Sequence, residues 1–120
     1  MGILTKLELA VLEDWISAHP EDAALQEQLV SAKVISRENS GVGYFTNIAA
    51  NRSAPPVKSI GPRSAAWVEI KGFEHPTGHV IWTAEGYIDC LEGFTIEDSS
   101  VDLNWADVEF TVLQDPNSSA

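Results

Sequence analysis

The spacing of apolar residues changes from helical to strand-like near Lys33. Before that point, apolar side chains recur at helical intervals over residues 5–18 and again over residues 20–32. Thr5 and Glu8 form the T-x-x-E pattern of a helix-capping box. Pro20 suits the first position of a second helix. The pattern therefore predicts a pair of short helices at the N-terminus.

Beyond Lys33, β-branched and aromatic residues alternate with polar ones, as they do in half-buried strands. We expect strands at 33–38, 42–48, 66–71, 79–84, 87–95 and 108–112, where the first two are either separate or one bulged strand. Residues 51–63 form a Pro-rich loop, and a helical turn is expected near Asn104. Helices followed by strands predict an α+β fold, a mainly antiparallel sheet of about five to six strands with the helices on one face. Residues 1–114 are expected to form one domain, followed by a disordered polar tail at 115–120.

The segment 79–95, HVIWTAEGYIDCLEGFT, gives the clearest structural signal. Two apolar runs flank Glu85-Gly86, and a two-residue hairpin turn needs positive φ, which Gly supplies. Counting outward from this turn pairs Ala84 with Tyr87, Trp82 with Asp89, Ile81 with Cys90, Val80 with Leu91 and His79 with Glu92.

Both faces of that hairpin are predicted to be apolar. In the predicted register one face carries Val80, Trp82, Ala84, Tyr87 and Leu91, and the other carries Ile81, Thr83, Ile88 and Cys90. The helix pair can cover only one of them. The second needs the Pro-rich loop, a second copy of the chain or a ligand over it, so we expect a homodimer or a pocket there.

The chain carries 7 basic and 18 acidic residues, which gives a formal net charge of -11. This charge disfavours nucleic acid and anionic membranes as partners, and it fits a basic partner protein or a merely soluble surface. No secretory signal or apolar membrane span is visible, and the single Cys cannot form an intrachain disulfide. We therefore expect a cytoplasmic protein without a cofactor.

Candidate chemistry gathers at the open end of the predicted hairpin. His79 beside Glu92, with His75 close through the turn, would make a carboxylate-held general base. Arg37 could hold a carboxylate or phosphate in its fork. A structural ion pair between His79 and Glu92 is the favoured interpretation, because no nucleophile or oxyanion hole accompanies them. Trp67 lies on the polar side of its strand and is therefore a candidate contact residue.

Three further patterns are interpreted as structural. The H-x3-H spacing of His75 and His79 is interrupted by Pro76 and Gly78 and supplies too few ligands for a metal, so no metal site is expected. Cys90 lies mid-strand among apolar residues, which predicts a buried, inert thiol. The glycines at 41–43 lack the remainder of a dinucleotide fingerprint and are expected to allow close strand approach.

Three segments resemble a family of small bacterial proteins to which no reaction is assigned. They are SRENSGVGYFT at 36–46, GFEHPTG at 72–78 and EGYIDCLEGFT at 85–95. The resemblance implies that the family shares Arg37, Glu38, Gly41, Gly43, His75, Gly78 and Glu92, and it implies no activity. The chain departs from the family pattern after Thr95.

Two functions of different classes follow from these features. The first is a non-enzymatic, acidic protein-interaction module, of which a toxin-neutralising, immunity-type protein is one version. The alternative is a small-ligand-binding protein or hydrolase centred on His75, His79, Glu92 and Arg37. Convergence of these side chains on one concave pocket would favour the alternative, and a scattered placement would favour the interaction module.

Overall fold

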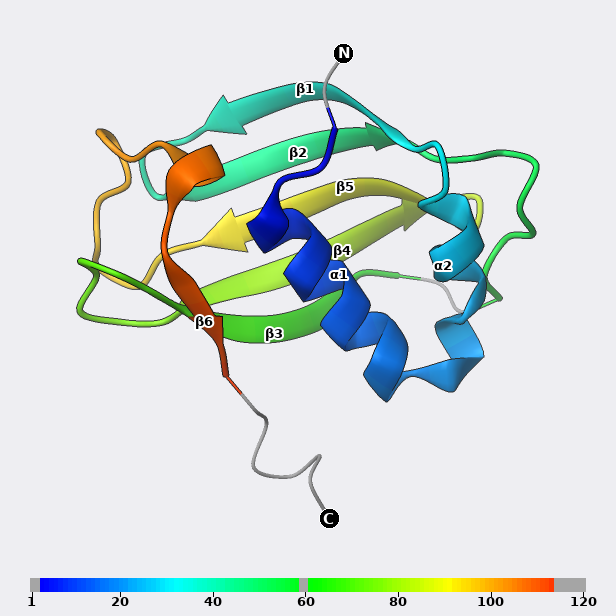
Figure 1. The fold of residues 1–120 in the computed structure, drawn as a ribbon, viewed down its shortest axis with the longest axis horizontal. Coiled ribbons are helices and arrows are strands. Elements are labelled where there is room, and N and C mark those ends of the chain that lie inside the picture. The colour runs from blue at the N-terminus through cyan, green and yellow to red at the C-terminus, as the bar shows by residue number, and fades with distance from the viewer. Residues whose placement is uncertain (1–2, 59–60, 114–120) are drawn as a thin grey trace.

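A six-stranded antiparallel sheet carries the two helices on one of its faces (Figure 1). The structure is a computed structural model that describes residues 3–58 and 61–113. The strand order is β1-β2-β5-β4-β3-β6. The elements in chain order are α1 (Lys6–Ala18), η1 (Pro20–Asp22), α2 (Ala24–Gln28), β1 (Lys33–Asn39), β2 (Gly43–Ala49), β3 (Arg63–Ile70), β4 (Thr77–Ala84), β5 (Tyr87–Phe94), η2 (Trp105–Asp107) and β6 (Phe110–Val112). The predicted α+β fold is confirmed, whereas the predicted tail at 115–120 lies outside the described residues.

Helix α1 begins at the predicted capping box. The Glu8 amide donates to Thr5 Oγ1 at 3.1 Å, and the Thr5 amide donates to Glu8 Oε1 at 2.7 Å. The prediction of a continuous second helix over 20–32 is wrong. Residues Pro20–Asp22 form a 3-10 turn, α2 ends at Gln28, and Ser31 adopts a φ of 63° that turns the chain into β1. Neither helix has the length and apolar character to cross a membrane within residues 3–58 and 61–113.

The strands follow the predictions except at their ends. The segments at 33–38 and 42–48 are two separate strands, β1 and β2, and β1 contains a bulge at Ile35. Strand β3 starts earlier than expected, at Arg63, and β6 spans only Phe110–Val112. The predicted helical turn near Asn104 is η2, which the Asn104 side chain caps by accepting from the Ala106 amide.

The hairpin turn forms as predicted, but the register beyond it does not. Glu85 and Gly86 have φ values of 55° and 87°, as the type I′ turn requires. A bulge at Asp89 then shifts β5 by one residue, so that Trp82 pairs with Cys90, Ile81 with Leu91, Val80 with Glu92 and His79 with Gly93. Because side chains alternate between faces, this shift moves every later residue of β5 to the face opposite the predicted one.

The core lies between the sheet and the helices. We call the sheet face that the helices cover the inner face, and the opposite one the outer face. The central rows of the inner face are Tyr44–Gly93–His79 and Thr46–Leu91–Ile81, and all six residues are buried. Helix α1 supplies Leu7, Val11 and Leu12, and α2 supplies Leu25. Ile81 and Ile88, predicted to share one face of the hairpin, are part of this core, so this is the face that the helices cover.

Candidate functional site

The outer face carries the largest group of solvent-accessible aromatic side chains on the sheet. Its central row runs across β1, β2, β5 and β4 as Glu38–Phe45–Glu92–Val80. The next row towards the hairpin turn runs Asn47–Cys90–Trp82. Viewed from the helix side, both helices and η2 lie in front of the sheet, and the outer face is turned away (Figure 1). The aromatic, apolar, acidic and thiol side chains of the outer face include Glu38, Phe45, Trp67, Val80, Trp82, Cys90, Glu92 and Phe94.

Two tryptophans of the outer face are substantially exposed. Trp67 is 42 % exposed and Trp82 is 40 % exposed, whereas Trp105 lies in the core. The Trp67 ring meets the edge of Phe94 at 5.6 Å between centroids. Phe94 in turn lies across Gly78, where any added Cβ would collide with the ring. Packing in the core, which is usual for Trp, therefore describes Trp105 alone among these three.

Two acidic side chains lie next to the aromatic rings of the outer face. Glu92 accepts a hydrogen bond of 3.0 Å from the Trp82 indole nitrogen, and Glu38 lies on the far side of Phe45 in the same row. Cys90 is half-buried between these groups, and burial, together with the nearby Asp89 and Glu92 charges, raises the pKa of its thiol. The predicted inert thiol thus lies on the outer face instead of among Ile81, Ile88 and Leu91.

Arg37, a predicted ligand-binding residue, is occupied by an internal ion pair. Its guanidinium donates to both carboxylate oxygens of Glu8, at 2.9 and 2.7 Å, and to the Ile3 carbonyl. Thr46 also donates to Glu8 at 2.5 Å. Burial raises the pKa of the Glu8 carboxyl, but the hydrogen bonds from Arg37, Thr46 and Thr5 outweigh it and give a net lowering. Arg37 therefore fastens β1 to the start of α1.

His79 is a core residue. Its side chain is 1 % exposed, and Nδ1 donates to the Ala66 carbonyl at 3.1 Å, because that oxygen can only accept. Its ring lies 5.7 Å from the Tyr44 ring. Burial, partly opposed by backbone hydrogen bonds, lowers the pKa of His79 to about 4. The imidazole is therefore neutral near pH 7.

His75 lies in the turn before β4, apart from His79. Its Nδ1 is 3.5 Å from Asp98 Oδ2, and Asp98 also accepts from the amides of Glu74 and His75 at 3.1 and 3.0 Å. These contacts, led by the Glu74 amide, lower the pKa of the Asp98 carboxyl. Asp98 thus joins the turn before β4 to the loop that follows β5.

The four residues of the predicted His/Glu/Arg site do not converge. The expected pairing of His79 with Glu92 is wrong, because the Asp89 bulge places His79 on the inner face and Glu92 on the outer face. Arg37 is tied to Glu8, and His75 to Asp98. Of the predicted contact residues, Trp67 and Glu92 share the outer face, where Trp67 contacts Phe94 and Glu92 accepts from Trp82.

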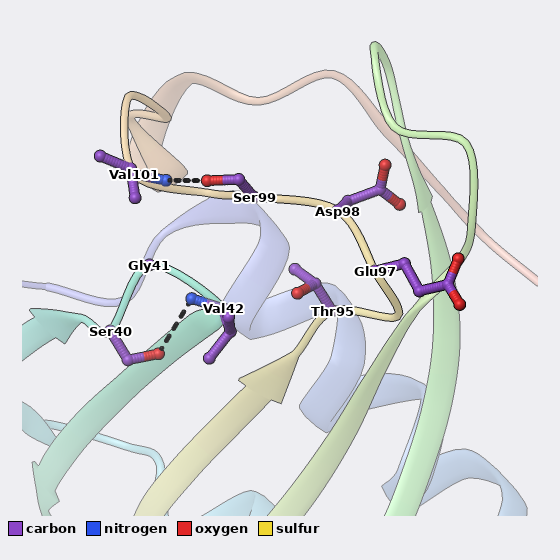
Figure 2. Close-up of a pocket in the computed structure, with 8 residues that line it drawn as sticks. All are labelled: Ser40, Gly41, Val42, Thr95, Glu97, Asp98, Ser99 and Val101. Atoms are coloured by element: carbon purple, nitrogen blue, oxygen red, sulfur yellow. Dashed lines mark hydrogen bonds between the residues drawn. The ribbon is translucent and has the colours of Figure 1, made fainter.

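Sequence reasoning missed a shallow pocket at the end of the sheet (Figure 2). It lies between the β1–β2 turn and the loop after β5, and its lining residues are Ser40, Gly41, Val42, Thr95, Glu97, Asp98, Ser99 and Val101. The Ser40 and Ser99 hydroxyls accept from the amides of Val42 and Val101, so they serve turns of their own loops. The pocket therefore offers little convergent chemistry.

Comparison with known proteins adds no assignment. No family model, no curated protein and no solved structure matches the chain. The resemblance to a family of small bacterial proteins remains a prediction.

Proposed function

We propose that the protein is a non-enzymatic interaction module that binds a basic protein partner through its outer face. The observation that carries this proposal is the open row of aromatic and acidic side chains, centred on Phe45, Trp82 and Glu92. Exposed Trp residues are frequent energetic anchors of protein interfaces, since each buries a large area at little entropic cost. The other predicted site residues, Arg37, His75 and His79, are engaged in structural contacts.

Charge selects the kind of partner. The formal net charge is -11, and Glu38 and Glu92 flank Phe45 on the outer face. A partner of opposite sign would be steered towards this face and would neutralise it on binding. A second copy would bring a like charge against it, which opposes the homodimer expected from the sequence. An immunity-type role, in which the partner is a basic toxin, is one form of this proposal.

Site-specific photo-crosslinking tests the proposal. Benzoylphenylalanine at Asn47, an exposed position beside Cys90 on the outer face, reports contacts of that face. The same group at Glu13, exposed on α1, is the matched control. After irradiation in cell lysate, we expect adducts with basic proteins from position 47 alone, and fewer adducts as the salt concentration rises.

Two further measurements make the result specific. The double substitution W67A/W82A should abolish the adducts at position 47, while size-exclusion chromatography with light scattering should show a monomer. Adducts that persist in the double variant, or that form equally at position 13, would contradict the proposal. A dimer broken by W67A/W82A would replace the basic partner with a second copy of the chain.

A further inference from the structure

Trp82 and Glu92 form a preorganised pair at the centre of the outer face. They lie on adjacent strands, β4 and β5, and the indole Nε1–H donates to Glu92 Oε1 at 3.0 Å. Phe45 on β2 and Val80 on β4 flank Glu92 on its two sides. These neighbours fix the carboxylate between apolar walls, and the hydrogen bond limits its rotation.

The pair has unused capacity for a cation. The indole hydrogen bond engages one carboxylate oxygen, and no Lys or Arg forms an ion pair with Glu92 among residues 3–58 and 61–113. The Trp82 ring beside it is 40 % exposed. A carboxylate next to an exposed indole supplies both groups that favour a guanidinium, an acceptor for its N–H fork and a π-face for its plane.

We propose that the Trp82–Glu92 pair seats an arginine side chain of the basic partner. This inference rests on the proposed function and names its central contact. The guanidinium donates to Glu92 and stacks on the Trp82 ring, while its aliphatic stem packs against Phe45 or Val80. Arginine is preferred to lysine, because an ammonium group can neither stack on the ring nor bind the carboxylate as a planar fork.

Another carboxylate on the sheet provides a matched comparison. Glu69 on β3 is exposed and pairs across the ladder with Thr111, so it has the same charge without an indole hydrogen bond. Removing its charge changes the net charge by the same amount as removing that of Glu92. Comparing E92Q with E69Q therefore distinguishes a specific arginine-binding site at Glu92 from a general attraction of basic peptides to an acidic protein.

Selection from a random twelve-residue peptide library tests the inference. The library is panned in parallel against the wild type, E92Q, E69Q and W67A/W82A. We expect arginine next to apolar residues in peptides enriched on the wild type and on E69Q. On E92Q the apolar enrichment should remain and the arginine enrichment should disappear. Thermal melts confirm that each variant is folded.

The best peptide then enters a double-mutant cycle. Replacing its arginine with citrulline, which keeps the shape and removes the charge, should weaken binding to the wild type about fivefold to tenfold and leave binding to E92Q nearly unchanged. Equal losses on both proteins would overturn the arginine-binding site, as would undiminished arginine enrichment on E92Q. Apolar enrichment without arginine would refute only this inference. Absence of any peptide sensitive to W67A/W82A would refute the proposed function as well.

Discussion

Gln28 beneath the inner face and Glu92 on the outer face are polar residues in contrasting environments. On the inner side, Gln28 is fully buried and completely hydrogen-bonded: its Nε2 donates to the carbonyls of Pro55 and Gly86, and its Oε1 accepts from the Ile88 amide. On the outer face, Glu92 and Trp82 keep part of their surface and bonding capacity accessible. Gln28 thus specifies how α2 and two loops join the sheet, whereas Glu92 and Trp82 keep bonding capacity that solvent can reach.

Two neighbouring residues of β4, one on each face, should differ most in their contribution to the free energy of unfolding. Ile81 is fully buried on the inner face, and Val80 is half-buried on the outer face. We expect I81A to lower the free energy of unfolding by about 4 kcal/mol, because it removes three carbons and leaves a cavity, and V80A to lower it by about 1 kcal/mol. Urea denaturation measures both. Similar losses would mean that the outer face is covered in solution.

Acidification should lower the stability of the fold through His79, a buried residue of the inner face. The pKa of His79 is about 4 in the folded chain and about 6.5 when the side chain is solvated. Between these values the unfolded state binds more protons, so stability is fully present above about pH 6.5 and falls by about 3 kcal/mol as the pH approaches 4. Denaturation from pH 7.5 to 5, a range above the ordinary pKa values of the carboxyl groups, should show the start of this fall, and H79Q should remove it. An NMR titration of the imidazole in the folded wild type supplies an independent check, since a midpoint near 6.5 would contradict the prediction.

A smaller difference is expected between two glycines that lie beneath aromatic rings. Gly93 faces the Tyr44 ring on the inner side, and Gly78 faces the Phe94 ring on the outer side, each too closely for a Cβ. Tyr44 is confined by His79 and Trp105, whereas Phe94 is half-exposed and can swing aside. We expect G93A to cost about 2 kcal/mol and G78A less than about 1 kcal/mol in thermal or urea unfolding. A reversed order would show that the outer aromatic ring is the more rigid one.

Sequence patterns predicted the elements of this fold better than their registration. The capping box at Thr5, the turn at Glu85-Gly86 and the succession of helices and strands along the chain all rest on local chemistry, and each appears in the structure. The expected pairing of His79 with Glu92 failed at a single residue, because the Asp89 bulge reversed the faces of β5. A physical signal was present: without a bulge, Asp89 would share a face with Leu91, a core residue. The mostly apolar strand around it gave no alternation that could reveal the shift.

Long-range polar contacts were beyond the reach of sequence patterns. Glu8 could be predicted to cap α1, but its link to Arg37 joins residues 29 positions apart, and that of Gln28 to Ile88 spans 60. Because a Glu in a capping box is usually exposed, the sequence pattern does not indicate that Glu8 is buried. Trp67 was identified because its strand alternates clearly, and Trp82 was not, because both neighbours of Trp82 are compatible with either face.

The bulge at Ile35 bears on how readily the chain aggregates at high protein concentration. Strand β1 forms a free edge of the sheet, seven residues long, where unpaired amides and carbonyls could template strands from other chains. Ile35 interrupts the regular pairing geometry, and Lys33 and Glu38 place opposite charges near the two ends of the strand. An edge strand with a bulge and charged residues is a poor template for fibrils. The chain can therefore expose aromatic rings on its outer face without strand-to-strand aggregation along β1.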